Sequence, residues 1–116
     1  MSAPEDLSGL SDAELYRIKF VRRLPEALDE LAGPEHGVVD LPLHVAWSGV
    51  TSYDVDRPRQ RMVLYSTVLQ EGMHDDLVAY LNRDFLLAQW PVLRKLVGRT
   101  VRTVWENAFP ELRTAA

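Results

Sequence analysis

The chain has 116 residues, no cysteine and a formal net charge of −4, with 47% apolar and 26% charged residues. This length suits one domain with its own core, and the composition is that of a globular protein rather than a disordered or fibrous one. The lack of cysteine excludes disulfides, thiolate metal sites and cysteine nucleophiles. An acidic chain also disfavours non-specific nucleic-acid binding, which depends on positive charge.

Residues 1–15 contain no basic region followed by an apolar run, and the chain nowhere has about eighteen consecutive apolar residues. We therefore expect no secretory signal, no membrane span and a cytoplasmic protein. Eleven arginines against two lysines are typical of a GC-rich bacterial genome. Residues 81–116 hold six basic and three acidic side chains, so the C-terminal third is basic although the whole is acidic.

The N-terminal third predicts a tail followed by helix. Residues 1–10 are expected to be a flexible tail because they contain few apolar side chains. Ser11 and Glu14 have the spacing of a capping box, and apolar residues then recur at helical spacing as far as Leu31. Pro25 lies inside this run, which predicts a kink or two successive helices.

Residues 38–55 are ambiguous between helix, strand and loop. Residues 37–47 (GVVDLPLHVAW) could form a strand, which Pro42 would confine to a sheet edge. The alternative, which we favour, is a short helix with Asp40 as its cap, Pro42 in its first turn and Gly49 at its end. Residues 50–56 are then expected to be an extended loop.

The second half of the chain is helical in period. Asp56 is expected to cap a helix that has Pro58 in its first turn and ends at Gly72. Pro91 and Gly98 should divide the following helical stretch, residues 75–109, into three pieces. The clearest apolar stripe in this stretch consists of Val97, Val101, Val104, Trp105 and Ala108.

The sequence thus predicts an all-α fold, a single domain of five or six short helices around a tryptophan-containing core. The helical domain should cover residues 11–110, with a C-terminal tail at 111–116. Trp105 is expected in the core with Trp47, whereas Trp90, which precedes a proline, is expected to be partly exposed. No Asn-Gly or Asp-Gly turn between alternating runs indicates a hairpin.

His74-Asp75-Asp76 has the residue types of a metal site. However, adjacent helical side chains point about 100° apart, and metal-binding pairs on helices use i, i+3 or i, i+4 spacing. Acidic residues just after Gly72 instead fit the first turn of a new helix, where the helix dipole favours them. We therefore predict a helix start here, no metal site and no cofactor.

A weaker pattern groups His44, Ser48 and Asp54 as base, nucleophile and orienting acid. The strand–elbow–helix context of a nucleophilic serine is missing, so a structural, half-buried histidine is the preferred interpretation of His44. His36 lies in a Pro/Gly loop and is expected to be solvated.

Two groups of cations are the best candidates for a binding site. Residues 53–61 (YDVDRPRQR) hold three arginines that Asp54 and Asp56 could clasp, or that could bind a phosphate or carboxylate. Residues 94–102 form a basic run that could lie on one face of an amphipathic helix. The predicted partner-binding residues are Arg57, Arg59, Arg61, Arg94, Lys95, Arg99 and Arg102.

Four segments cover most of the chain after residue 23: LPEALDELAGPEHGVVDLPLHVAWSG, YDVDRPRQRMVLYSTVLQEG, DDLVAYLNRDFLLAQWPVLRKLVG and VRTVWENAFPEL. Together they resemble a family of small uncharacterised actinobacterial proteins. Members of that family resemble the smaller partner in gene pairs with a nucleotidyltransferase-like toxin. The resemblance implies an antitoxin-like or regulatory interaction role and brings no catalytic residues.

We therefore expect a non-enzymatic module that binds a protein partner, in the manner of an antitoxin. The alternative is a small DNA-binding transcriptional regulator that uses the basic C-terminal helices, although Pro91 stands where a recognition helix should begin. A third hypothesis is a small hydrolase around His44 and Asp54. Spare apolar surface on several short helices also leaves a homodimer open.

Overall fold

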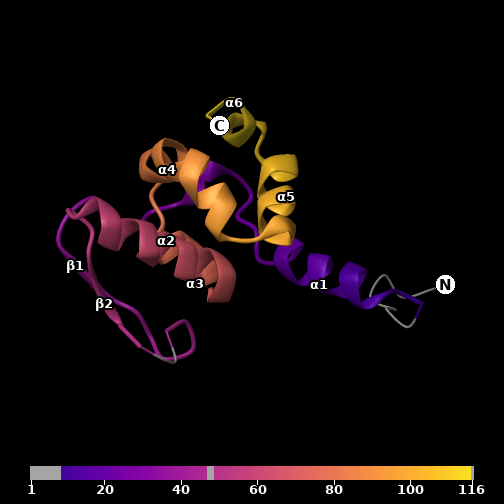
Figure 1. Ribbon diagram of the computed structural model, residues 1–116, viewed down its shortest axis with the longest axis horizontal. Coiled ribbons are helices and arrows are strands. Elements are labelled where there is room, and N and C mark those ends of the chain that lie inside the picture. Colours follow the sequence, from indigo (N-terminus) through magenta and orange to yellow (C-terminus); the bar gives the residue numbers. More distant parts are fainter. Residues whose placement is uncertain (1–8, 47–48, 116) are drawn as a thin grey trace.

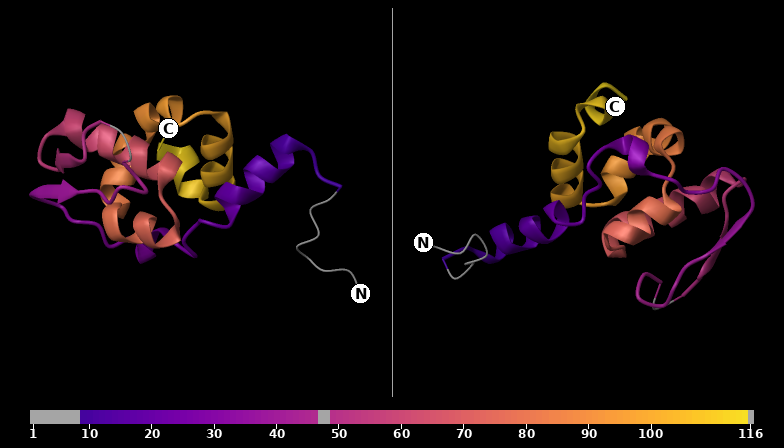
Figure 2. Two further views of the ribbon diagram at one scale, coloured as in Figure 1. Left: turned by 90° about the horizontal axis from the view of Figure 1, so that it is seen from below. Right: turned by 180° about the vertical axis from the view of Figure 1, so that it is seen from behind.

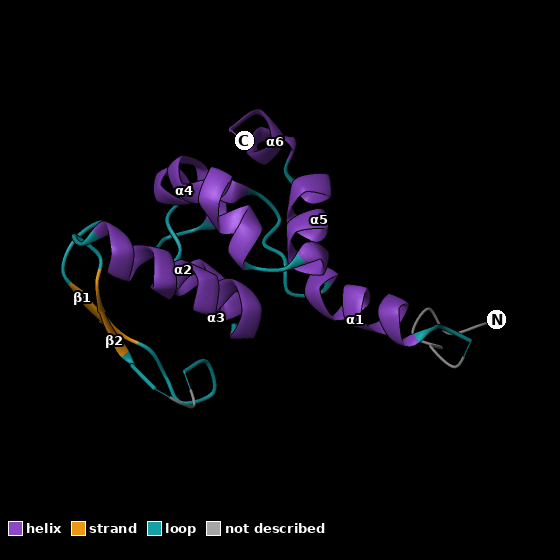
Figure 3. Ribbon diagram, viewed as in Figure 1, coloured by secondary structure: helices purple, strands orange, loops and turns teal. Residues whose placement is uncertain are grey.

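The computed structural model describes residues 9–46 and 49–115. Over these residues the chain is mostly helical, with six α-helices, one 3-10 turn (η1) and one small antiparallel sheet (Figures 1 and 3). The predicted helical class is confirmed, and the strand pair is an addition to it. The elements in chain order are α1 (Asp12–Val21), η1 (Leu28–Glu30), β1 (Val38–Asp40), β2 (Ser52–Asp54), α2 (Pro58–Glu71), α3 (His74–Tyr80), α4 (Arg83–Leu96), α5 (Arg99–Ala108) and α6 (Pro110–Ala115).

Helix α1 begins as its capping box predicts. The Glu14 amide donates to the Ser11 hydroxyl at 3.1 Å, and the Glu14 carboxylate accepts from the Ser11 amide at 3.4 Å. The helix ends at Val21, four residues before Pro25, and the chain re-forms only the short turn η1. The predicted pair of successive helices is therefore one helix and one turn.

The residues predicted as a short helix, 40–49, belong instead to a hairpin, so that interpretation was wrong. Asp40 ends β1, and residues 41–46 and 49 lie in the connection from β1 to β2. Strands β1 and β2 pair antiparallel, with Val39 opposite Tyr53. Their inward side chains, Val39, Tyr53 and Val55 among them, are buried, while Val38 on the opposite face is 67% exposed. A strand with one buried face needs every second side chain to be buried. The burial of these side chains outweighs the proline and glycine positions that would also suit a short helix.

Helix α2 begins at Pro58, but Asp56 does not cap it. Arg57 occupies the cap position and makes no side-chain capping bond. The Asp56 carboxylate instead accepts from the Gly37 amide at 3.1 Å and hydrogen-bonds His36 Nδ1 at 2.8 Å. Asp56 therefore closes the open end of the hairpin rather than the start of the helix.

The last third divides at different places from those predicted. Gly98, with φ of 84°, separates α4 from α5 as expected, but α4 runs through Pro91 without a break. The other division lies between α3 and α4 at Leu81, followed by Asn82, whose side-chain oxygen accepts from the Asp84 amide at 3.0 Å and caps α4.

The tail predicted at 111–116 is also corrected, because α6 covers most of it. Leu112 is fully buried between α4 and α5, on which α6 packs. Trp90 and Trp105 lie in the core, so the partial exposure predicted for Trp90 was wrong, while Trp47 lies outside the described residues. None of the helices within the described ranges has the length and apolar character needed to cross a membrane.

The hairpin and α1 project from opposite sides of the helical body (Figures 1 and 2). Helix α1 packs against α5, whereas β2 packs against α2. This arrangement leaves a junction between the hairpin and α2 at one end of the molecule, and the candidate site lies there.

Candidate functional site

The predicted arginine cluster of residues 57–61 is divided by the structure. Arg57 Nε lies 3.4 Å from Asp54 Oδ2 at the surface, so one half of the predicted clasp forms. Arg61 turns inward: its guanidinium donates to the Val55 carbonyl at 2.9 Å and lies 4.1 Å from the ring centre of Phe85. Arg59 is exposed and has neither a hydrogen bond nor an ion pair among the described residues.

The predicted C-terminal basic face is also smaller than the sequence indicates. Arg94 Nε donates to Glu106 Oε2 at 2.8 Å, and the indole of Trp90 donates to the same oxygen at 2.9 Å. The hydrogen bond from Arg94 is the main reason that the pKa of Glu106 lies below its ordinary value. Arg94 therefore joins α4 to α5, and the exposed cations of this run are Lys95 and Arg99, with Arg102 half-buried.

The two groups of cations lie on separate parts of the molecule. Residues 57–61 are beside the hairpin at the start of α2, whereas residues 94–102 surround the turn between α4 and α5 (Figure 1). The seven predicted residues therefore do not form a single binding surface.

Each histidine is paired with a carboxylate from another segment. His44 Nε2 lies 2.8 Å from Asp76 Oδ2, which links the hairpin loop to α3. His74 Nε2 lies 2.7 Å from Glu30 Oε1 and its Nδ1 lies 3.0 Å from Asp75, and these hydrogen bonds raise the pKa of His74. The pKa of His36 is likewise raised by its hydrogen bond to Asp56.

These pairs bear on the two chemical hypotheses. Helix α3 starts at His74, with Asp76 accepting from the Met73 amide at 2.9 Å, which agrees with the predicted helix start. In the described part of the chain no group of three ligands could hold a metal ion. The hydrogen-bond partner of His44 is Asp76 rather than Asp54, and Ser48 lies outside the described residues.

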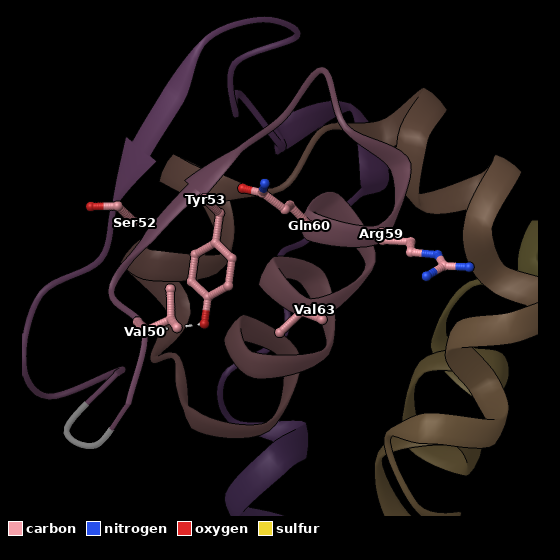
Figure 4. Close-up of a pocket in the computed structure, with 6 residues that line it drawn as sticks. All are labelled: Val50, Ser52, Tyr53, Arg59, Gln60 and Val63. Carbon is pink, nitrogen blue, oxygen red and sulfur yellow. Dashed lines mark hydrogen bonds between the residues drawn. The ribbon is translucent and has the colours of Figure 1, made fainter.

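A groove lies between β2 and the first two turns of α2 (Figure 4). Its volume is about 670 Å³, within the range of ligand-binding pockets. The aromatic ring of Tyr53 lies between Val50 and Val63 on its apolar side, and the Tyr53 hydroxyl donates to the Val50 carbonyl at 2.9 Å. The lining residues are Val50, Ser52, Tyr53, Arg59, Gln60 and Val63.

The groove combines exposed apolar side chains with polar side chains at its border. Val50 is 63% exposed and Val63 is 51% exposed, whereas Tyr53 beneath them is almost wholly buried. Arg59 borders the groove with its side-chain stem and directs its guanidinium away from the Tyr53 ring (Figure 4). Such a site can bury an apolar side chain of a ligand while a charged group of the ligand reaches the guanidinium.

Sequence reasoning identified one of the six groove residues, Arg59. The sequence predicts an extended loop for residues 50–56, although their side chains alternate. The signal that could have found the site is that Val50, Ser52 and Asp54 alternate with Tyr53 and Val55, as a strand with one buried face does.

Comparisons of the chain with protein-family models, with curated proteins and with solved structures found no match. The site must therefore be interpreted from its own geometry.

Proposed function

We propose that this chain is a non-enzymatic protein-interaction module that holds a partner protein in the groove between β2 and α2. The observation that carries the proposal is the exposure of Val50 and Val63 beside the Tyr53 ring in a hollow of about 670 Å³. Partly exposed apolar residues around an aromatic floor are typical of the central part of a protein interface, and an arginine at the border is typical of its rim.

The chemistry of the lining supports binding rather than catalysis. The groove is lined by two valines, a phenol, a hydroxyl, an amide and a guanidinium. The phenol and the hydroxyl are engaged, the first with the Val50 carbonyl and the second with Asp40. General acid–base catalysis needs a group that titrates near the working pH within reach of a substrate, and the lining has no such pair.

The test is affinity capture of partners from a lysate of the native host by wild-type protein and by two valine variants. Val63→Arg places a charge in the groove, while Val92→Arg makes the same change on α4 at equal exposure, 50% against 51%. We expect a stoichiometric partner that withstands high salt, is lost with Val63→Arg and is retained with Val92→Arg. Retention by both variants, or loss by both, would contradict the proposal.

DNA binding by the C-terminal helices is the second candidate. It is supported by exposed Lys95 and Arg99 beside the α4–α5 turn. It is weakened by Glu106, which engages Arg94 and lies close enough to Arg102 for a favourable charge interaction. Nucleic acid recovered in the same capture experiment, lost steeply as salt rises and lost with Arg99→Glu, would favour this candidate instead.

The antitoxin-like role is narrower than the interaction module and rests on the sequence resemblance alone. It makes a definite prediction, that the captured partner is a nucleotidyltransferase-like protein whose activity falls when this chain is added. A captured partner of another kind would leave the interaction module standing and remove the antitoxin role. The cytoplasmic location and the homodimer likewise remain proposals.

A further inference from the structure

The hydrogen-bond pattern of the hairpin determines which way the backbone groups of β2 point. The Leu41 amide donates to the Thr51 carbonyl at 2.8 Å, and the Val55 amide donates to the Gly37 carbonyl at 2.9 Å. In an antiparallel pair, hydrogen-bonded residues alternate with residues whose amide and carbonyl point away from the partner strand. The amides and carbonyls of Ser52 and Asp54 therefore point away from β1.

The outward edge of β2 faces α2 and the groove. The Asp54 amide donates to the Gln60 side-chain oxygen at 2.8 Å, so a side chain of α2 already takes the place of a neighbouring strand at this residue. The Asp54 carbonyl accepts from the Arg57 amide at 3.1 Å. Both outward groups of Asp54 are thus satisfied, and Gln60 marks where this edge meets the groove.

Ser52, two residues before Asp54 on the same edge of β2, differs from Asp54 in the hydrogen bonds of its backbone. Its hydroxyl donates to Asp40 on the neighbouring strand, but its amide and carbonyl have no hydrogen-bond partner in the described part of the chain. Ser52 lines the same groove as Gln60 and the exposed side chains of Val50 and Val63. The groove therefore offers a backbone donor and a backbone acceptor beside an apolar hollow.

We propose that the groove binds an extended segment of the partner protein, which adds to the outward edge of β2. The segment would exchange two backbone hydrogen bonds with Ser52 and lay an apolar side chain on Tyr53 between Val50 and Val63. A carboxylate of the segment would pair with Arg59, whose exposed side chain would turn its guanidinium back toward the border of the groove. This inference rests on the proposed function, and it adds the conformation and chemistry of the ligand.

An extended ligand fits this site better than a helical one. A helix satisfies its own backbone groups and would cover Ser52 without bonding to it, whereas an added strand satisfies the amide and the carbonyl together. Specificity then comes from alternate side chains of the strand, one in the apolar hollow and one at the border. An acidic residue is favoured because Arg59 has no carboxylate partner among the described residues, while its neighbour Arg57 is paired with Asp54.

The sheet has a second open edge, on β1, which provides the control. The amides and carbonyls of Val38 and Asp40 also point away from their partner strand, as the same alternation requires. The groove lies on the β2 side and does not include these residues. Proline at Val38 and proline at Ser52 therefore each remove one outward amide while leaving the ladder bonds in place.

The experiment selects a phage-displayed library of random peptides on the full chain and measures the affinity of the most enriched peptide by fluorescence anisotropy. We expect its sequence to alternate apolar and polar residues and to contain an acid. Ser52→Pro should weaken its binding by about tenfold, as loss of a buried hydrogen bond predicts. Val38→Pro should change the affinity by less than about twofold, and Ser52→Ala, which keeps the amide, should bind as the wild type does.

A second variant keeps the test decisive if Ser52→Pro does not fold, which circular dichroism would reveal. Arg59→Glu should weaken the selected peptide, and a peptide with its acid changed to lysine should recover affinity for this variant. Failure to enrich any peptide, equal binding to Ser52→Pro, or equal loss with Val38→Pro would overturn the inference. A partner that is lost with Val63→Arg yet retained by Ser52→Pro would overturn it while leaving the proposed function intact.

Discussion

Glu106 joins α4 to α5 through hydrogen bonds from two residues of α4. Its carboxylate accepts from Trp90 and Arg94 and is 13% exposed. Glu106→Ala removes both hydrogen bonds and leaves the indole N–H of buried Trp90 without an acceptor, so we expect the free energy of unfolding to fall by about 2 kcal/mol. Urea unfolding followed by circular dichroism measures this, with exposed Glu111→Ala as the control. Equal losses in the two variants would show that Glu106 does not join α4 to α5.

The histidine pairs predict how stability depends on pH. The pKa values of His36 and His74 are raised above 6.5 by hydrogen bonds to carboxylates, so the folded state binds their protons more tightly than the unfolded state. Their stabilisation is present in full below about pH 6.5 and is lost as pH rises through the raised pKa values. The urea midpoint should therefore fall as the pH rises from about 6.5 through the raised pKa values of these two histidines.

The matched variant is the double change His36→Gln and His74→Gln, which should flatten the urea midpoint over that interval. The lowered pKa values of Asp56 and Glu106 affect stability in a different pH range, because the stabilisation from these two carboxylates is lost only as the pH falls through acidic values. An unchanged slope in the double variant would assign the pH dependence to other groups.

At the scale of single residues, the sequence predicts which types of side chain the candidate sites contain, but not which partner each side chain contacts. Arg59 and Arg61 lie two positions apart in one helix, yet Arg61 reaches the Val55 carbonyl and the Phe85 ring, and Arg59 is exposed. A shift of two helical positions turns the side chain by about 200°, and only the packing of α2 on α4 determines which of the two faces inward. Arg94 likewise meets Glu106 only after the chain reverses at Gly98.

At the scale of elements, Gly33 shows how closely the segment after η1 packs on α3. Its amide donates to the Leu81 carbonyl at 2.8 Å, and a Cβ atom at this position would lie 2.4 Å from the Tyr80 carbonyl carbon. Gly33→Ala should therefore lower the free energy of unfolding by about 1–3 kcal/mol, because backbone atoms of α3 would have to move.

The control for that change is Gly9→Ala, where an added Cβ would meet no atom within 4 Å. Its urea midpoint should equal that of the wild type, as for most surface substitutions. A wild-type midpoint in Gly33→Ala as well would mean that the loop and α3 are not in backbone contact in solution.

The helices were largely predictable from local signals, whereas the hairpin was not. A capping box at Ser11, Pro58 in a first turn and Gly98 after a last turn each locate an end of a helix. Strands β1 and β2 have three residues each and are joined by a long loop rather than a two-residue turn. Their pairing, and with it the groove, depends on the apolar support of α2 beneath Tyr53, which no short window of sequence contains.

At the scale of the whole molecule, the last helix, α6, packs into the core of the helical body. Helix α6 packs on both α4 and α5, and Leu112 has no exposed surface. The sequence placed a tail here because Pro110 follows a completed apolar stripe, and proline commonly stands just after a helix. Proline is equally suited to the first turn of a new helix, and the buried leucine two residues later makes that the more stable outcome.

Leu112→Ala tests whether this last helix belongs to the cooperative core. Truncation of a fully buried leucine leaves a cavity, so we expect the free energy of unfolding to fall by about 2–5 kcal/mol, with one transition retained. Leu43→Ala is the matched control because the same atoms are removed at a site that is 75% exposed, and its effect should stay within about 0.5 kcal/mol. Equal, small effects in urea unfolding would mean that α6 detaches before the rest unfolds, and that the core ends with α5.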